Sequence, residues 1–415
     1  MHLWLRVFIG MCLGIAAGII LGKYAAVFQP LGTIFINLIL MLVIPLIFFV
    51  IINGIVSIED PTNIKRIGSK SIILFISTAV AAVILGMIVT SIIKPGVGVH
   101  FQLLSNVNSF AAVEKNNLTT IFLNIIPSNA LKSLVEGNIL HVILLAFFIG
   151  ITLKSKHDSF INIIKFIKEM SQLMINMIET IVKIAPFGVF GYMSWAVGTQ
   201  GIDILLPLLK LIFTIFIGCV LQYILFGIII LIVAQLSPLP FYYKMIGPQL
   251  LAFSTSCSKA TLATLMKTAH EKLGLSKTNT NVLIPLASVL NMDGGALYLS
   301  SCVLFFGQVM GVNFSIQDYF TIIVTCTLGS IGAAGIPSGI LLFLGMALTA
   351  VGLPIEAVAI IAGVDRILDM VTTVINVTGD ACIPLIIDKT EGTLDVKVYN
   401  NMTSNYGKEQ IQNNF

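Results

Sequence analysis

Charged residues are scarce in this 415-residue chain. Only 10% of its residues are Asp, Glu, Lys or Arg, against roughly 25% in an average soluble domain. This low content excludes an ordinary water-soluble fold, and the net charge of +4 is too small to indicate a nucleic-acid partner. Hydrophobic residues make up 57% of the chain, and the mean hydropathy is +1.01. These values predict a polytopic membrane protein.

The chain also lacks clustered metal-binding or disulfide-forming side chains. Its six cysteines show no CxxC spacing and lie scattered in apolar segments, which predicts buried free thiols. The five histidines are dispersed, and none belongs to an HExxH motif. Neither a structural metal site nor an organic cofactor is therefore expected.

Six apolar runs in the first 236 residues are long enough to cross about 30 Å of hydrocarbon. No cleavage site of the Ala-x-Ala type follows the first run, so this run is expected to be a retained span and not a signal peptide. The runs lie at about 3–22, 32–56, 71–93, 139–153 with its preceding segment, 170–197 and 204–235.

Lysine and arginine are absent between Lys277 and Arg366, so any loop in that stretch is expected to be external or buried. The polar stretch at about 94–137 is also assigned to the outside. Loops rich in Lys and Arg are expected to be cytoplasmic, and both termini are expected on the cytoplasmic side of the membrane. The residues concerned are Lys65, Arg66, Lys70, Lys154, Lys156, Lys165, Lys168, Lys389, Lys397 and Lys408. The absence of long eukaryotic-style loops and of a targeting segment favours a prokaryotic plasma membrane.

Runs of small polar residues interrupt the apolar stretches beyond Leu236. Residues 253–261 are rich in serine and threonine, and residues 329–339 are rich in glycine. Neither run predicts a continuous helix, and both are typical of re-entrant hairpins whose tips line a cavity. A span with an Asn and an Asp follows each hairpin, and lysines flank only the first. The two hairpins are therefore expected to enter from opposite faces, as in an inverted repeat with its site near the midplane.

A polar stripe marks residues 365–380, near the C-terminus. At 100° per residue, a helix places four polar side chains of this segment within about 60° of one another. Ionisable groups at membrane depth cost at least about 2.5 kcal/mol each and usually mark a substrate or ion path. The stripe therefore predicts a small-molecule transporter. Its members are Asp369, Thr373, Asn376 and Asp380.

Two other functional classes fit these residues less well. Ser258 beside Lys259 is the only hint of a membrane hydrolase, but neighbours on a helix point about 100° apart and do not form a dyad. Residues 335–339 also fail the GxSxG spacing, so an enzyme is not expected. A channel is disfavoured because occluding hairpins and paired carboxylates predict stoichiometric binding.

Four motifs together resemble the dicarboxylate/amino acid:cation symporter family, which includes aspartate and glutamate transporters and neutral amino-acid exchangers. They are the serine-rich segment 254–261, Asn-Met-Asp-Gly-Gly-Ala-Leu-Tyr at 291–298, the glycine-rich tip 330–337, and residues 365–380. The resemblance implies an all-α membrane protein with eight transmembrane spans and two re-entrant helical hairpins, arranged as inverted repeats.

The same resemblance implies a homotrimer of elevator-type transporters, in which one part of each subunit moves against a scaffold. Residues 1–236 would form the scaffold and trimerisation spans, with the third and sixth spans associated with the moving part. Residues 237–388 would form the transport domain, and residues 389–415 a cytoplasmic tail.

By resemblance, Asp369 would hold the ammonium of an amino-acid substrate, and Thr373 would assist it. Asn376 and Ser258, with the backbone of the first hairpin, would hold the α-carboxylate. An internal ion pair between Asp369 and Arg366 is the alternative. The second hairpin is expected to be the extracellular gate, because its glycines allow a lid to move. The remaining expected substrate residues are Gly295, Ile331, Gly335 and Thr372.

The resemblance also implies three sodium sites built from oxygen ligands, as hard cations prefer. Asp380 with the carbonyls of Asn291 and Asn376 would make the first. Family members driven by protons commonly carry Asn in place of Asp380, so sodium is the expected coupling ion. The second site would comprise Asp293, the Asn291 side chain and Thr78, and the third the carbonyls of Val289, Ser330, Ile331 and Ala333.

Three positions depart from the members that carry acidic substrates. Thr372 stands where those members use an arginine for the side-chain carboxylate. Gly295 replaces a threonine, and Ser256 replaces an arginine that some members carry. The sequence therefore predicts sodium symport of a small neutral amino acid such as serine or alanine. Arg366 and Lys259 leave an alternative open, a sodium- or proton-coupled symporter of glutamate, aspartate or a dicarboxylate.

Overall fold

The computed structural model describes residues 3–56, 64–99, 129–136, 139–201, 205–333, 339–355 and 357–401, and these residues contain helices but no strand. The first half comprises α1 (Leu3–Leu21), η1 (Gly22–Phe28), α2 (Gln29–Val56), α3 (Ile64–Ile93), α6 (Ala130–Glu136), α7 (Ile139–Ser155), η2 (His157–Ser159), α8 (Ile161–Val182) and α9 (Ala185–Gln200). The second half comprises α10 (Leu205–Ile229), the π-helical η4 (Ile230–Ala234), α11 (Pro238–Thr255), α12 (Ser258–Glu271), α13 (Lys277–Leu290), α14 (Asp293–Val309), α15 (Ile316–Gly332), α16 (Gly339–Ala350), α17 (Ala357–Ala362), α18 (Asp365–Glu391) and α19 (Val396–Asn400).

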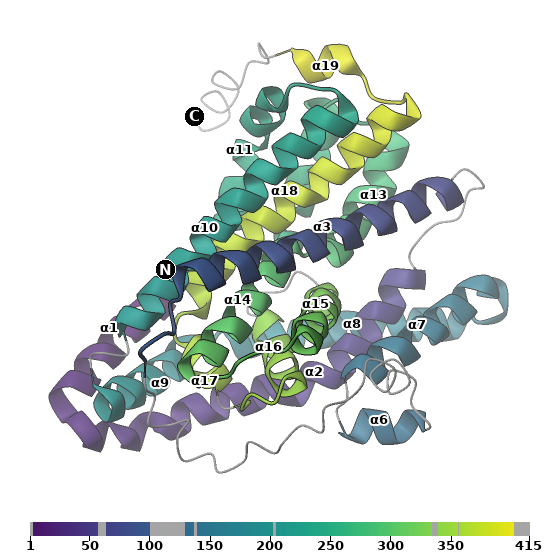
Figure 1. The fold of residues 1–415 in the computed structure, drawn as a ribbon. Coiled ribbons are helices and arrows are strands. Elements are labelled where there is room, and N and C mark those ends of the chain that lie inside the picture. Colours follow the sequence, from purple (N-terminus) through teal and green to yellow (C-terminus); the bar gives the residue numbers. More distant parts are fainter. Residues whose placement is uncertain are drawn as a thin grey trace, which may run out of the picture.

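The helices pack in two groups. In the first, α1 packs along α9, and α2 packs on α7, α8 and α9. In the second, α18 lies among α10, α11, α13 and α14, and α3 runs along α14. Figure 1 shows the purple α1 and α2 low in the molecule, while α10, α11 and the yellow part of α18 rise together above them. Spans three and six of the predicted series, α3 and α10, thus pack with the C-terminal helices.

Five helical segments in the described part are long and apolar enough to cross a membrane, judged by length and composition. They establish a multi-pass membrane protein, while the count of eight spans stays a prediction. The segments are Leu5–Phe35, Lys70–Ile93, Leu205–Ala234, Asn279–Val309 and Asp365–Glu391.

The prediction of one continuous span over residues 170–197 is wrong. Helix α8 ends at Val182 and α9 begins at Ala185, with Pro186 in the first turn of α9. Proline lacks a backbone N–H and has a fixed φ, so it fits the first turn of a helix and ends a preceding one. Hydropathy alone did not reveal this break, because the residues on both sides are apolar.

Helices α11 and α12 form the first predicted hairpin, and α15 packs against α16 as the second. Ser256 makes the bend of the first hairpin in a left-handed conformation, with φ of 50°, and its N–H donates to the Ala252 carbonyl at 2.8 Å. The tip of the second hairpin, residues 334–338, lies outside the described residues. The predicted gate and Gly335 therefore cannot be placed.

The start of the predicted cytoplasmic tail packs on the base of the first hairpin. The buried Lys244 of α11 donates to the carbonyls of Lys272, Val398 and Tyr399 at 2.8, 2.8 and 2.6 Å. The Tyr399 hydroxyl donates to the Ser237 carbonyl at 2.7 Å, and burial raises the pKa of this hydroxyl. One lysine thus joins α11, the end of α12 and α19, a contact that no sequence motif indicated.

Replacing Lys244 with Met is expected to lower the free energy of unfolding by about 2 kcal/mol, because three carbonyls in buried or part-buried hydrogen bonds lose a charged donor. Thermal unfolding of the purified protein in detergent measures this effect. Lys267→Met is the matched control, since Lys267 is exposed on the same hairpin. Equal unfolding midpoints for the two variants would show that the Lys244 contacts do not stabilise the fold.

Candidate functional site

A break in the helix carrying the Asn-Met-Asp motif creates the centre of the candidate site. Helix α13 ends at Leu290 and α14 begins at Asp293, and Asn291 between them has non-helical angles of φ −92° and ψ 83°. A break of this kind frees backbone carbonyls, and the first turn of α14 favours a negative charge because of the helix dipole. Asn291 and Asp293 are both fully buried.

Asp293 is held by side chains from two other helices. The Thr78 hydroxyl of α3 lies 3.3 Å from Asp293 Oδ1 and 3.4 Å from Asn291 Oδ1. Gln222 of α10 donates to Asp293 Oδ2 at 3.0 Å. The structure therefore brings together the three residues of the second predicted sodium site. Gln222 was not predicted from the sequence as a member of this group. Its only mark in the sequence is that it is the one amide side chain of α10.

Asp380 is a deeply buried carboxylate of α18. It is 0% exposed, and neither of its oxygens has a hydrogen-bond partner in the described part. The Asn291 amide lies beside it and donates to the Asn376 carbonyl at 3.5 Å. Gly379 makes this approach possible, because a Cβ there would collide with the Asn291 amide nitrogen. A buried carboxylate with only a neutral amide beside it remains costly unless a cation or a proton accompanies it.

The polar stripe of α18 lies in the interior. The Thr373 hydroxyl is 3.4 Å from Asp369 Oδ1, and Asn376 Oδ1 accepts a hydrogen bond from the Gly294 N–H at 2.8 Å. Asp369, Thr373 and Asn376 are all buried. The Thr372 hydroxyl instead donates to the Leu368 carbonyl of its own helix at 3.0 Å. The stripe thus faces the protein interior, and its Asn376 meets the first turn of α14.

The tip of the first hairpin lies against the first turn of α18. Arg366 Nη2 donates to the Thr255 carbonyl at 3.1 Å. Ser256 and Ser258 are buried, and their hydroxyls have no hydrogen-bond partner among the described residues. Asp369 is close enough to Cys257 to act on it electrostatically. Ser258 and Asp369, far apart in the sequence, are thereby brought into one region.

The residues expected near the second hairpin are placed in part. Gly295 of α14 lies against Ile340 of α16, and α15, which packs on α13, ends near Ser330. The Ser330 carbonyl already accepts a hydrogen bond from the Ala333 N–H at 3.1 Å. The remaining residues of this set are the half-buried Ile331 and Val289 and, outside the described residues, Gly335.

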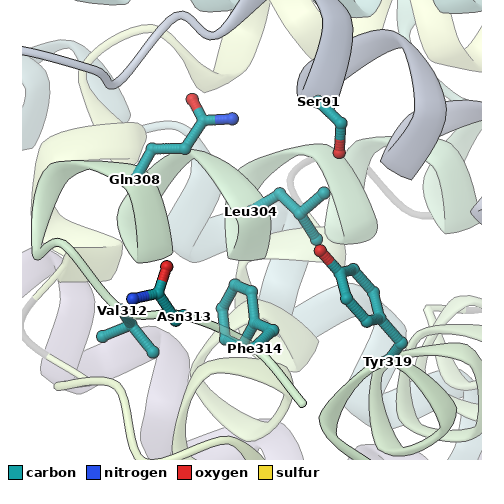
Figure 2. Close-up of a pocket in the computed structure, with 7 residues that line it drawn as sticks. All are labelled: Ser91, Leu304, Gln308, Val312, Asn313, Phe314 and Tyr319. Carbon is teal, nitrogen blue, oxygen red and sulfur yellow. The ribbon is translucent and has the colours of Figure 1, made fainter. Parts of the chain in front are cut away.

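Two cavities are found in the described part of the chain. One of about 600 Å³ separates α2 and α8 from the first hairpin, and three lysines line it, Lys165, Lys168 and Lys259. The other, of about 170 Å³, has no charged lining residue, and Figure 2 shows Ser91 and Tyr319 pointing toward Leu304 within it. None of the predicted substrate residues lines either cavity.

The chain is similar over almost its whole length to known cation-coupled symporters. A proton/sodium-glutamate symport protein of Bacillus caldotenax is 32% identical over 399 residues, which cover 93% of this chain and 94% of that protein. The proton/glutamate-aspartate symporter of Escherichia coli (strain K12) is 30% identical over 405 residues, or 92% of each chain. A C4-dicarboxylate transport protein of Bacillus subtilis (strain 168) is 30% identical over 402 residues, covering 95% of this chain and 94% of that protein.

The profile of the "Sodium:dicarboxylate symporter family" matches residues 3–390, a range that runs from the first residue of α1 to one residue before the end of α18. This match and the relatives confirm the resemblance that the hairpin, Asn-Met-Asp and α18 motifs indicated. The family consists of transporters and not of enzymes. The chain belongs to the sodium:dicarboxylate symporter family.

Proposed function

We propose that this protein carries an acidic amino acid or a C4-dicarboxylate across the membrane together with sodium. The relatives support the acidic class, since their names specify glutamate, aspartate and C4-dicarboxylates. They favour the alternative left open by the sequence over the small neutral amino acid that Thr372, Gly295 and Ser256 predicted. Sodium and protons both occur in the names of the relatives.

The observation that carries the sodium proposal is the Asp380 carboxylate, which is fully buried and has no hydrogen bond of ordinary geometry among the described residues. The neighbouring Asn291 amide is neutral and does not balance its charge. A sodium ion held by Asp380 and the carbonyls of Asn291 and Asn376 would neutralise it. A second ion would bind Asp293, the Asn291 side chain and Thr78. A third would take the carbonyls of Val289, Ser330, Ile331 and Ala333.

The substrate would lie between α18 and the two hairpins. A dry site must neutralise both the ammonium and the carboxylate of an amino acid. Asp369 with Thr373 would bind the ammonium. The hydrogen bond from Gly294 turns the Asn376 oxygen toward α14, so its NH₂ group is the donor for the α-carboxylate, with Ser258. The side-chain end would meet Gly295 and Thr372, and Ile331 and Gly335 would cover the site.

The two packing groups suggest how transport occurs. Helices α1, α2, α7, α8 and α9 would form the scaffold of a homotrimer, and α3 and α10 to α18 would move as an elevator. Few pairs of helices join the two groups, among them α16 with α2 and α17 with α9. The N- and C-termini would be cytoplasmic in a plasma membrane.

A small neutral amino acid is the second candidate substrate. The observation that favours it is the Thr372 hydroxyl, which is bonded to the Leu368 carbonyl and provides no positive charge where acid-transporting members use an arginine. A neutral side chain would need no cation at this position.

Uptake by the purified full-length protein in proteoliposomes tests the proposal. Labelled aspartate, glutamate, succinate, serine and alanine are compared under separately imposed sodium and proton gradients. Sodium-driven uptake of aspartate, glutamate or succinate is expected. Uptake of serine and alanine alone would establish the second candidate, and uptake driven only by protons would refute sodium coupling. Current without uptake would indicate a channel.

A further inference from the structure

A buried amide oxygen without a partner lies beside the Asn-Met-Asp break. Gln222 of α10 is 0% exposed, and its amide nitrogen donates to Asp293 Oδ2 at 3.0 Å. Its Oε1 atom is also buried and has no hydrogen-bond partner among the described residues. An acceptor removed from water without a partner costs stability, and native proteins rarely keep one unless an ion, a water molecule or a function explains it. The Gln222 oxygen is therefore available to a donor or a cation.

The position of α10 lets Gln222 take part in the polar centre. This helix packs on α3, α14 and α18, which carry the Thr78 hydroxyl and the two carboxylates of the proposed sodium sites. Gly218, one turn before Gln222, allows α10 to approach α14 closely, since a Cβ there would lie only 3.0 Å from the Leu297 side chain. This close packing brings the Gln222 amide to the Asp293 carboxylate.

The second proposed sodium site needs more oxygen atoms than its three predicted residues supply. Hard cations take about six or more oxygen ligands in proteins, whereas Asp293, Asn291 and Thr78 offer few. All three side chains are at most 5% exposed, so bulk water has little access to complete the coordination shell. Because the Gln222 amide already contacts Asp293, its unused oxygen can reach an ion there without movement of a helix.

We infer that Gln222 binds the sodium ion held by Asp293, through its amide oxygen, and that the amide turns over when the ion arrives. The last torsion of a glutamine has a broad, roughly two-fold profile, so its oxygen and nitrogen exchange places easily. Without the ion, the NH₂ group donates to Asp293, as observed. With the ion, the oxygen faces the cation, because the NH₂ group offers only donors. This inference rests on the proposed function, since it completes one of the sodium sites.

Gln222 has one competing role, which is to hold the Asp293 carboxylate in place as a hydrogen-bond donor only. The two roles require different atoms of the amide, because a sodium ligand needs the oxygen and a donor needs the N–H group. Gln222→Glu keeps oxygen atoms of the same reach but loses the N–H group. Gln222→Met has nearly the same size and loses both. The two variants together therefore separate the roles.

The test measures the sodium concentration for half-maximal effect, in thermal unfolding without substrate and in uptake at saturating aspartate. Both are run at constant ionic strength and at pH 8, which favours ionised carboxylates. In Gln222→Met this concentration is expected to rise about 10- to 100-fold, the range seen when groups around a metal are removed. In Gln222→Glu it is expected to stay within about threefold or to fall, because hard cations prefer carboxylate oxygens. Gln249→Met is the matched control, since the half-buried Gln249 donates to the Thr378 hydroxyl.

The outcomes separate this inference from the proposed function. If sodium drives no uptake by the unaltered protein, the proposed function fails and the inference with it. If sodium drives uptake and Gln222→Met requires no more sodium than the unaltered protein, only the inference is overturned. It is also overturned if Gln222→Glu requires as much sodium as Gln222→Met, because the site then depends on the N–H group and not on the oxygen.

Infrared spectroscopy tests the ligand role in the unaltered protein. With carbon-13 in the side-chain carbonyls of glutamine, addition of sodium is expected to shift one amide carbonyl band, because a cation polarises the carbonyl that it binds. Gln222→Glu assigns the band, since this variant lacks the labelled carbonyl at that position. Identical glutamine bands in the sodium difference spectra of the two proteins would overturn the inference.

Discussion

Replacing Asp380 with asparagine is expected to reduce sodium-driven uptake by about 100-fold or more. Even residues that only support a metal ligand change affinity or activity by 10–100-fold, and Asp380 would be a direct ligand. Asparagine has nearly the same size, so the effect would come from the lost charge and not from a cavity. Uptake by proteoliposomes across a series of external sodium concentrations measures it, and higher sodium is not expected to restore the rate.

Asp158→Asn is the control for the Asp380 variant, because Asp158 is exposed in η2. Uptake in Asp380→Asn with unchanged sodium dependence would contradict the assignment of a sodium ion to this carboxylate. In that case, a proton and not a sodium ion would neutralise the buried Asp380 of the unaltered protein.

Replacing Asp369 with asparagine is expected to raise the KM for aspartate by at least about 30-fold. Removing one partner of a buried, hydrogen-bonded charge pair typically costs about 2–5 kcal/mol. Succinate has two carboxylates but no ammonium, so its competition with labelled aspartate is not expected to weaken. The comparison of aspartate with succinate therefore isolates the contact between Asp369 and the ammonium.

Asp158→Asn again serves as the control for the loss of a carboxylate. If Asp369→Asn weakens aspartate and succinate to the same extent, Asp369 maintains the structure of the site and does not bind the ammonium. Thr373→Val is expected to have a smaller effect in the same direction, because Thr373 assists Asp369 through a contact of 3.4 Å.

Much of the candidate site could be predicted from helical geometry. Four residues of α18 recur at intervals that place them on one face, and a lipid-facing helix does not carry such a row. A run of small polar residues identified the Ser-rich hairpin, and the break between α13 and α14 falls on the Asn-Met-Asp motif. Local patterns suffice here because each depends on residues close together in the chain.

Contacts between distant segments could not be predicted in this way. Gln222 binds Asp293 from another helix, and Lys244 joins the first hairpin to α19 across more than 150 residues. The break between α8 and α9 was also missed, because hydropathy does not register a turn inside an apolar run.

The sequence by itself determined the class of protein and its family, because composition, apolar runs and motif spacing are properties of the chain alone. Only the tertiary structure decided which polar groups are left without partners. Asp380 is a predicted sodium ligand from the sequence, but only the packing shows that it is removed from water without a hydrogen bond of ordinary geometry, whereas Thr372 and Asn376 of the same helix find partners. That difference depends on which helices surround each side chain, and the neighbouring residues in the sequence do not reveal it.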